Sequence, residues 1–129
     1  MADVATRLRT FLLADSSIAA AVGPRVHQAF VPEDPTTPFI YFSRAGTGDE
    51  LCIGEIGAAP FSHTFAMECI GKDLDESQSI AALVKTRCNG YFGSFADTTV
   101  KGIFVEDQSD DYEPQYGYHD ASLSLEVVP

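Results

Sequence analysis

Three histidines and three cysteines are the side chains of this sequence best suited to bind a metal ion or to act as nucleophiles. They are His27, His63, His119, Cys52, Cys69 and Cys88. No histidine stands at a metal-ligand spacing from a cysteine, and there is no Gly-x-Ser-x-Gly elbow for a nucleophilic serine. The odd number and wide spacing of the cysteines indicate reduced thiols packed in a core rather than a disulfide framework. We therefore predict no catalytic residues, no metal site and no cofactor, and a protein that is not an enzyme.

Two glycine-containing segments resemble nucleotide-binding motifs but lack residues that those motifs need. After Gly46-Thr47-Gly48, Leu51 stands where a dinucleotide-binding fingerprint has its third glycine, and no helix is predicted to follow. Gly71-Lys72-Asp73 lacks the upstream glycine and the hydroxyl residue of a phosphate-binding loop. Neither segment supports a nucleotide site.

Carboxylates are concentrated in residues 106–113, which invites a test for a calcium loop because hard cations prefer several oxygen ligands. Tyr112 occupies the position where an EF-hand loop needs a glycine for its sharp turn, so the match fails. We interpret Asp107, Asp110, Asp111 and Glu113 as a solvated acidic loop between two strands.

The overall composition limits the classes of function that remain. The chain has 129 residues, of which 45% are hydrophobic, and this is enough for one core. Its formal net charge is −11, from 8 basic and 19 acidic residues, so the average field repels nucleic acid. No export signal and no run of about 20 apolar residues is visible, which predicts no membrane partner.

Apolar residues at helical spacing predict two main helices. One helix carries Val4, Leu8, Phe11 and Leu12, and the other carries Ile80, Leu83, Val84 and Cys88. A cap at Asp73 or Asp75 begins the second, and Asn89-Gly90 ends it. Between them, Ser16 or Ser17 can cap a short helical turn over residues 18–22 that ends at Gly23-Pro24.

Strands are expected over residues 26–31, 39–42, 61–70, 100–106 and 118–128, the third and the last by clear alternation of apolar and polar residues. Residues 43–60 interleave glycines with apolar side chains, a pattern too broken for a core strand and too apolar for a solvated loop. We predict a protruding hairpin arm there, whose Leu51, Ile53 and Ile56 need cover from a neighbouring subunit.

Consecutive strands favour an antiparallel or mixed sheet. The predicted fold is therefore α+β, with a sheet of four to five strands, two main helices packed on one face and the protruding arm.

Taken in order, these segments resemble the tail-completion, or tail-terminator, proteins of long-tailed bacteriophages, prophages and gene transfer agents. The likeness covers nearly the whole chain, and it rests on order and spacing rather than on one motif. The similar segments are residues 18–26, 38–43, 67–69, the helix with Ser77, Ala81 and Val84, residues 102–104, residues 111–114 and residues 122–125. At two places the chain departs from the family, which often has an aromatic residue at the position of Cys69 and a basic residue near His119, where this chain has Asp120.

The resemblance implies a single tail-terminator-like domain over residues 1–129 and a structural virion protein of the tail or neck, assembled in the host cytoplasm. It implies a ring, usually of six copies, that caps the tail tube, ends its polymerisation and joins it to the head-side connector. The partners are then other copies of the chain, the tail tube protein and the connector protein. DNA would pass through the ring without specific binding, and the acids at 107, 110, 111 and 113 are candidates for its lining.

Other classes stay open from the sequence. A head-tail adaptor or stopper ring would show the same features and differ only in its partners. A small-molecule binding module would show a defined pocket and a smaller oligomer, and an acidic inhibitor that mimics DNA would use the charge directly.

Overall fold

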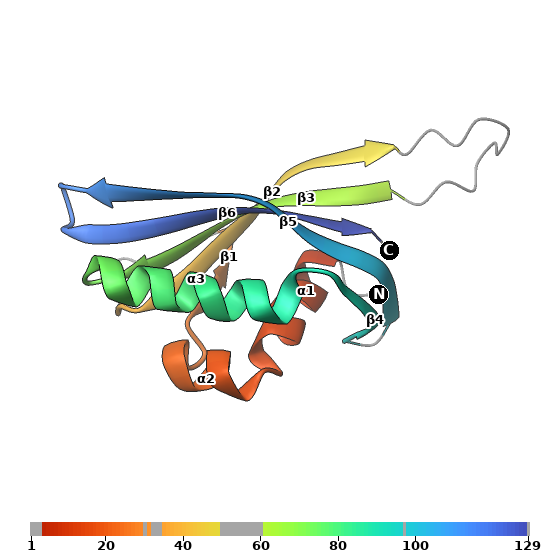
Figure 1. Cartoon of the computed structure of the whole chain (residues 1–129), viewed down its shortest axis with the longest axis horizontal. Helices are drawn as coiled ribbons and strands as arrows, with labels where there is room; N and C mark the ends of the chain where they lie inside the picture. The colour runs from red at the N-terminus through yellow and green to blue at the C-terminus, as the bar shows by residue number, and fades with distance from the viewer. Residues whose placement is uncertain (1–3, 30, 32–34, 50–60, 97, 129) are drawn as a thin grey trace, which may run out of the picture.

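The structure, a computed structural model, describes residues 4–29, 31, 35–49, 61–96 and 98–128. In chain order the elements are α1 (Val4–Leu13), α2 (Ser16–Val22), β1 (Val26–Gln28), β2 (Phe39–Asp49), β3 (Phe61–Gly71), α3 (Leu74–Cys88), β4 (Tyr91–Phe95), β5 (Thr98–Glu113) and β6 (Tyr118–Val128). The strands form one six-stranded sheet in the order β1-β2-β3-β6-β5-β4. β1 is parallel to β2, and the other neighbouring pairs are antiparallel. The described helices all lie on one face of this sheet (Figure 1).

The predicted α+β fold with a mixed sheet is confirmed, but the strands differ in number and length. The sheet has six strands rather than four or five, because Tyr91–Phe95 forms β4 against the first part of β5. β5 continues to Glu113 instead of stopping at Glu106, since its second half pairs with β6 residue by residue up to Glu113↔Tyr118. None of the helices that the structure describes combines the length and apolar character that a membrane span requires.

Carboxylate caps fix where the helices begin. Asp73 Oδ1 accepts the N–H of Glu76 at 2.8 Å, which starts α3 at the first of the two predicted caps. The cap of α2 is Asp15 rather than Ser16 or Ser17, because Asp15 Oδ1 already accepts the N–H groups of Ser17 and Ile18. These caps set the direction from which each helix approaches the sheet.

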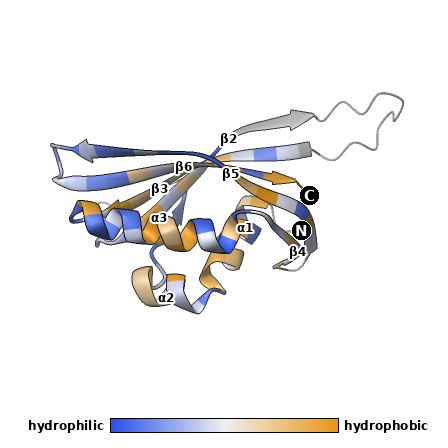
Figure 2. Ribbon diagram, viewed as in Figure 1, coloured by the Kyte–Doolittle hydropathy of each residue, from blue (hydrophilic) through white to orange (hydrophobic). Residues whose placement is uncertain are grey.

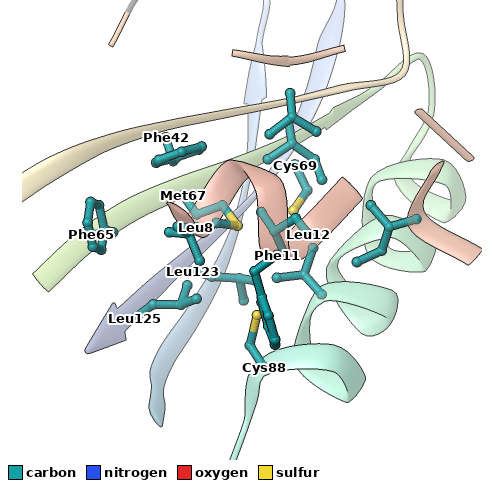
Figure 3. Close-up of a cluster of buried hydrophobic side chains, with 14 of the residues drawn as sticks. Leu8, Phe11, Leu12, Phe42, Phe65, Met67, Cys69, Cys88, Leu123 and Leu125 are labelled. Atoms are coloured by element: carbon teal, nitrogen blue, oxygen red, sulfur yellow. The ribbon is translucent and has the colours of Figure 1, made fainter. Parts of the chain in front are cut away.

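The hydrophobic core fills the layer between the helices and the sheet (Figure 3). Its labelled side chains come from α1 (Leu8, Phe11, Leu12), β2 (Phe42), β3 (Phe65, Met67, Cys69), α3 (Cys88) and β6 (Leu123, Leu125). Alternation places every second residue of β3 and β6 on this side. The sequence-predicted apolar stripes are therefore the ones that are buried.

Arginines join the helices to each other and to the loops. Arg87 of α3 lies over the Phe11 ring at 3.9 Å and donates two hydrogen bonds, of 3.2 and 3.0 Å, to the Phe11 carbonyl of α1. Arg9 donates to the carbonyls of Val26 and Pro24. These guanidinium groups satisfy buried or half-buried carbonyl oxygens while their stems and faces pack on apolar neighbours.

Candidate functional site

The sheet face opposite the helices, called here the open face, is the surface on which polar and aromatic side chains gather. Strand register sets its rows: Phe39, Ile70, Asp120 and Asp111 lie side by side, followed by Tyr41, Glu68, Ser122 and Ser109, and then by Ser43, Ala66, Ser124 and Asp107. Figure 2 shows the β5–β6 hairpin end of the sheet in hydrophilic colours. The open face is thus made of the residues that alternate with the core.

A pocket of about 590 Å³ opens on this face near the β5–β6 turn. Its lining is aromatic (Phe39, Tyr41, Tyr116, Tyr118), aliphatic (Val31, Pro35, Ile70) and acidic (Glu68, Glu113, Asp120). The volume falls within the range of small-ligand sites, and three carboxyl groups on aromatic walls suit a cation better than an anion.

The aromatic walls hold one another in place. The rings of Tyr116 and Tyr118 are stacked with centroids 5.8 Å apart, and Phe39 meets Tyr118 edge to face at 6.1 Å. The Tyr118 hydroxyl donates to the Pro35 carbonyl at 3.5 Å, which links β6 to the connector before β2. Phe39 is only 2% exposed although it belongs to the open face, so the aromatic cluster forms a small apolar layer outside the main core.

Two carboxyl groups meet in the floor of the pocket. Burial raises the pKa of Asp120 to about 7, and the neighbouring Glu68 adds to the shift through like charge and a hydrogen bond between the two carboxyl groups. Asp111 raises it further, while the Ser122 hydroxyl, 3.5 Å from Asp120 Oδ1, acts in the opposite direction. Asp120 is therefore about half protonated at neutral pH.

A second pair of carboxyl groups lies on the same face near the other end of β6. A hydrogen bond with Glu106 raises the pKa of Glu126, with smaller contributions from desolvation and from the charge of Glu106. Glu106 stands at the irregularity in β5 between Val105 and Asp107. The open face thus carries carboxyl pairs at two places, and only the first belongs to the pocket.

The four acids predicted to form a loop lie in strand β5 instead, and they do not share one surface. Asp107 and Asp111 pair with Ser124 and Asp120 on the open face, and Glu113 lines the pocket. Asp110 pairs with Ala121 on the helix side, where the Gln78 side chain of α3 donates to it at 3.3 Å. The loop interpretation was wrong because pairing with β6 outweighs the low strand propensity of acidic residues.

The other predicted site residues, Leu51, Ile53 and Ile56, lie outside the described residues, and the hairpin arm stays a prediction. β2 is described up to Asp49 and β3 from Phe61, and these ends are paired with each other. The chain on either side of the predicted arm is therefore an antiparallel strand pair.

The outer edge of β5 carries its own hydrogen-bond acceptors. Within the described strands β4 pairs with β5 only up to Ile103, so the edge beyond it lacks a neighbouring strand. The backbone N–H of Gln108 donates a hydrogen bond to the Asp107 carboxylate, and that of Tyr112 donates one to the Asp111 carboxylate, each at 2.8 Å. Charged side chains on such an edge oppose pairing with another strand.

Thiols and imidazoles do not assemble into a reactive centre in the part of the chain that the structure describes. Cys69 and Cys88 are free and buried, and burial raises both thiol pKa values, that of Cys88 to about 12. Burial and the charges of Arg9 and Arg25 lower the pKa of His27. No group of three potential ligands suited to a metal ion occurs among the described residues.

Sequence reasoning missed the pocket itself. Alternation in residues 118–128 already placed Asp120 on a polar face, but Glu68 lies on another strand and Tyr116 in a turn. Only the register Glu68↔Ser122 and Ile70↔Asp120 brings the two carboxyl groups together. A more informative signal was the presence of three tyrosines in residues 112–118, two of which, Tyr116 and Tyr118, line the pocket.

Comparison with known proteins identifies the class to which this fold belongs. A chain of a solved structure, "Virion of native gene transfer agent (GTA) particle", is similar with a TM-score of 0.70 and 20% identity, covering 98% of this chain and 97% of that chain. At this identity the match shows a shared fold. No curated protein matches the chain.

The family follows from the sequence match. Residues 6–128 match the family described as "Tail completion protein gp17", and the chain belongs to it. The resemblance to tail-completion proteins is therefore confirmed, and the protein is a structural component of the virion tail.

Proposed function

We propose that the chain is the tail terminator: copies form a ring, of six subunits, that caps the finished tail tube, stops its polymerisation and joins it to the head-side connector. The observation that carries this proposal is the match of residues 6–128 to the tail-completion family. On this view residues 1–129 act as one domain.

A closed ring requires two different patches on each subunit that fit each other. The sheet ends in β1 on one side and in β4 on the other, where β5 forms the edge beyond its pairing with β4. These edges differ in the way such an interface needs: β1 is short and parallel to β2, whereas the second half of β5 is long and lined with acids. We propose that the arm, through Leu51, Ile53 and Ile56, covers a surface of the next subunit. The shielding of β5 by Asp107 and Asp111 favours a recipient surface other than that edge.

We also propose that the acids of the open face line the channel. Asp107, Asp111 and Glu113 are exposed, and a ring that turns them inward would present like charge to DNA and let it slide. Asp110 faces α3 and is the matched control. Replacing Asp107 and Asp111 by Lys should slow DNA ejection, whereas Asp110→Lys should not; equal ejection rates for all variants would contradict a channel lining.

The decisive experiment removes the gene product from an assembling particle and measures the tails by electron microscopy. Loss of a terminator leaves tails of uncontrolled length without heads, because nothing ends tube growth. Tails of normal length that fail to join heads would instead assign the chain to a head-tail adaptor or stopper ring.

The ring itself is tested on the purified chain by light scattering coupled to size exclusion, with imaging by negative stain. Rings are expected alone or on addition of purified tail tube. A chain that stays monomeric over a wide concentration range and also in the presence of tube ends would overturn the proposal.

A further inference from the structure

We propose that the pocket of the open face is a socket for one arginine side chain of a partner protein in the tail. The guanidinium group would lie between the rings of Tyr41, Tyr116 and Tyr118 and bridge the carboxylates of Glu68 and Asp120. The biological role of this contact rests on the proposed function, whereas the binding of arginine to the pocket does not.

The pocket lining matches two properties of a guanidinium group. Its planar face stacks on aromatic rings, and its fork of N–H donors can reach two carboxylates at once. The stacked pair Tyr116 and Tyr118 supplies the ring surface, and Tyr116 is 63% exposed, so an incoming side chain can reach it. Glu68 and Asp120 supply two acceptors on neighbouring strands.

A cation would also relieve an unfavourable feature of the isolated subunit. Glu68 and Asp120 repel each other, and Asp111 on β5 and Glu113 near the turn add negative charge on the same side. The other titratable groups of the lining are the phenols of Tyr41, Tyr116 and Tyr118. None of the described residues that line the pocket carries a positive charge to balance these acids, so a cation from outside would complement them.

The charge pattern favours a partner over a second copy of this chain. The five arginines are already engaged in their own subunit: Arg9, Arg25 and Arg87 donate to backbone carbonyls, Arg44 lies over the Phe65 ring, and Arg7 also has an interaction. A chain of net charge −11 meets repulsion from its own copies and attraction from a basic partner.

Binding of arginine to the socket should depend on pH. Because Asp120 has a pKa of about 7, it must lose its proton to bind the guanidinium group as a carboxylate. Binding should therefore strengthen from pH 6 to pH 8 and release protons. This dependence separates the pocket from a simple exposed acidic patch, whose carboxylates are ionised throughout that interval.

The test uses the full chain, labelled with ¹⁵N, and the peptide N-acetyl-Gly-Arg-Gly-amide, followed by amide chemical shifts at pH 6 and pH 8. The neutral isostere with citrulline in place of arginine is the ligand control. We expect saturable shifts at residues 68, 118 and 120, stronger at pH 8, and none with citrulline. Equal shifts with citrulline, tighter binding of the same peptide with lysine in place of arginine, or absence of saturation would each overturn the proposal.

Matched variants locate the binding. Glu68→Gln and Asp120→Asn should each weaken the arginine peptide by about tenfold, the usual effect of removing one charge-assisted hydrogen bond. Glu126→Gln removes one carboxylate from the second pair and should leave binding unchanged. Circular dichroism checks that each variant is folded, and Tyr116→Ala, a change at an exposed turn residue, tests the ring surface independently. Unchanged affinity in all three pocket variants would overturn the proposal.

Two further outcomes keep this inference separate from the proposed function. Rings that form normally while the arginine peptide fails to bind would refute the socket alone. Shifts at residues 68 and 120 that grow with protein concentration without peptide, and vanish in Glu68→Gln, would assign the pocket to a second copy and refute the partner.

Discussion

The two faces of the sheet carry opposite kinds of side chain, although the same strands build both. On the helix side, Phe65, Met67 and Leu123 are buried among apolar neighbours, and no buried side-chain nitrogen or oxygen of the described residues lacks a hydrogen-bond partner. On the open side, the alternate residues Glu68 and Asp120 bring two carboxyl groups together, and the pKa of Asp120 is raised to about 7. The first face holds the main core, whereas the second brings carboxyl groups close together. Groups with perturbed pKa values are typical of functional sites.

The largest effect expected from this contrast is in the core. Phe65→Ala removes a ring that packs edge to face on Phe42 at 5.8 Å, and it should lower the free energy of unfolding by about 3–5 kcal/mol. Ala66→Ser, one residue along on the open face, should change it by less than about 0.5 kcal/mol. Urea unfolding of both variants measures the difference. Similar losses in the two variants would show that the open face is covered in the isolated chain.

The contact between α3 and α1 should come next. Arg87→Met keeps the apolar stem but removes both hydrogen bonds to the Phe11 carbonyl and the charge over its ring, and about 1–3 kcal/mol should be lost. Arg87→Lys keeps the charge without the planar fork and should recover only part of this. Thermal unfolding measures the series, and full recovery by Lys would mean that charge alone joins the helices.

The helix side was the more predictable of the two faces. Helical spacing of Leu8, Phe11 and Leu12 and the alternation in residues 118–128 identify α1 and β6, because burial on one side leaves a regular period in the sequence. β4 was missed because it is short and contains Gly93, and β5 was shortened because its acidic second half gives no apolar period. Its pairing with β6 is a tertiary effect.

The open face could be predicted only in outline. Alternation shows that Asp120 points away from the core, yet its carboxyl partner Glu68 is fixed by the β3–β6 register, which a single sequence does not encode locally. Likewise, the four acids of residues 107–113 seemed to form one group until the strand period assigned Asp110 to the helix side. Function classes were inferred from the family resemblance, not from these side chains.

A smaller effect on stability is expected from the ionisation of Asp120 on the open face. The folded-state pKa of Asp120 lies above its ordinary value of 3.8, so the folded state holds this proton more tightly than the unfolded state does. The stability that Asp120 contributes is fully present below about pH 4, where the carboxyl group is protonated in both states, and it is lost as the pH rises through 7. Because the group is half exposed, we expect Asp120→Asn to gain on the order of 1 kcal/mol relative to the native chain at pH 8, and little at pH 5.

Urea unfolding at the two pH values measures this gain, with Asp75→Asn as the control because Asp75 is exposed on α3. A gain for Asp120→Asn that is the same at pH 5 and pH 8 would show that ionisation of Asp120 is not its cause.

The smallest effect on stability is expected at the exposed edge of β5. Asp107→Ala removes one negative charge and the acceptor of the Gln108 N–H, leaving an edge amide available to another strand. Asp110→Ala removes the same charge but only a bond to the Gln78 side chain. Both should change the free energy of unfolding by less than about 0.5 kcal/mol. Only Asp107→Ala should self-associate more than the native chain, measured by sedimentation velocity at matched concentrations. If Asp110→Ala associates equally, the charge of the strand protects its edge, and the carboxylate cap on Gln108 has no separate part in it.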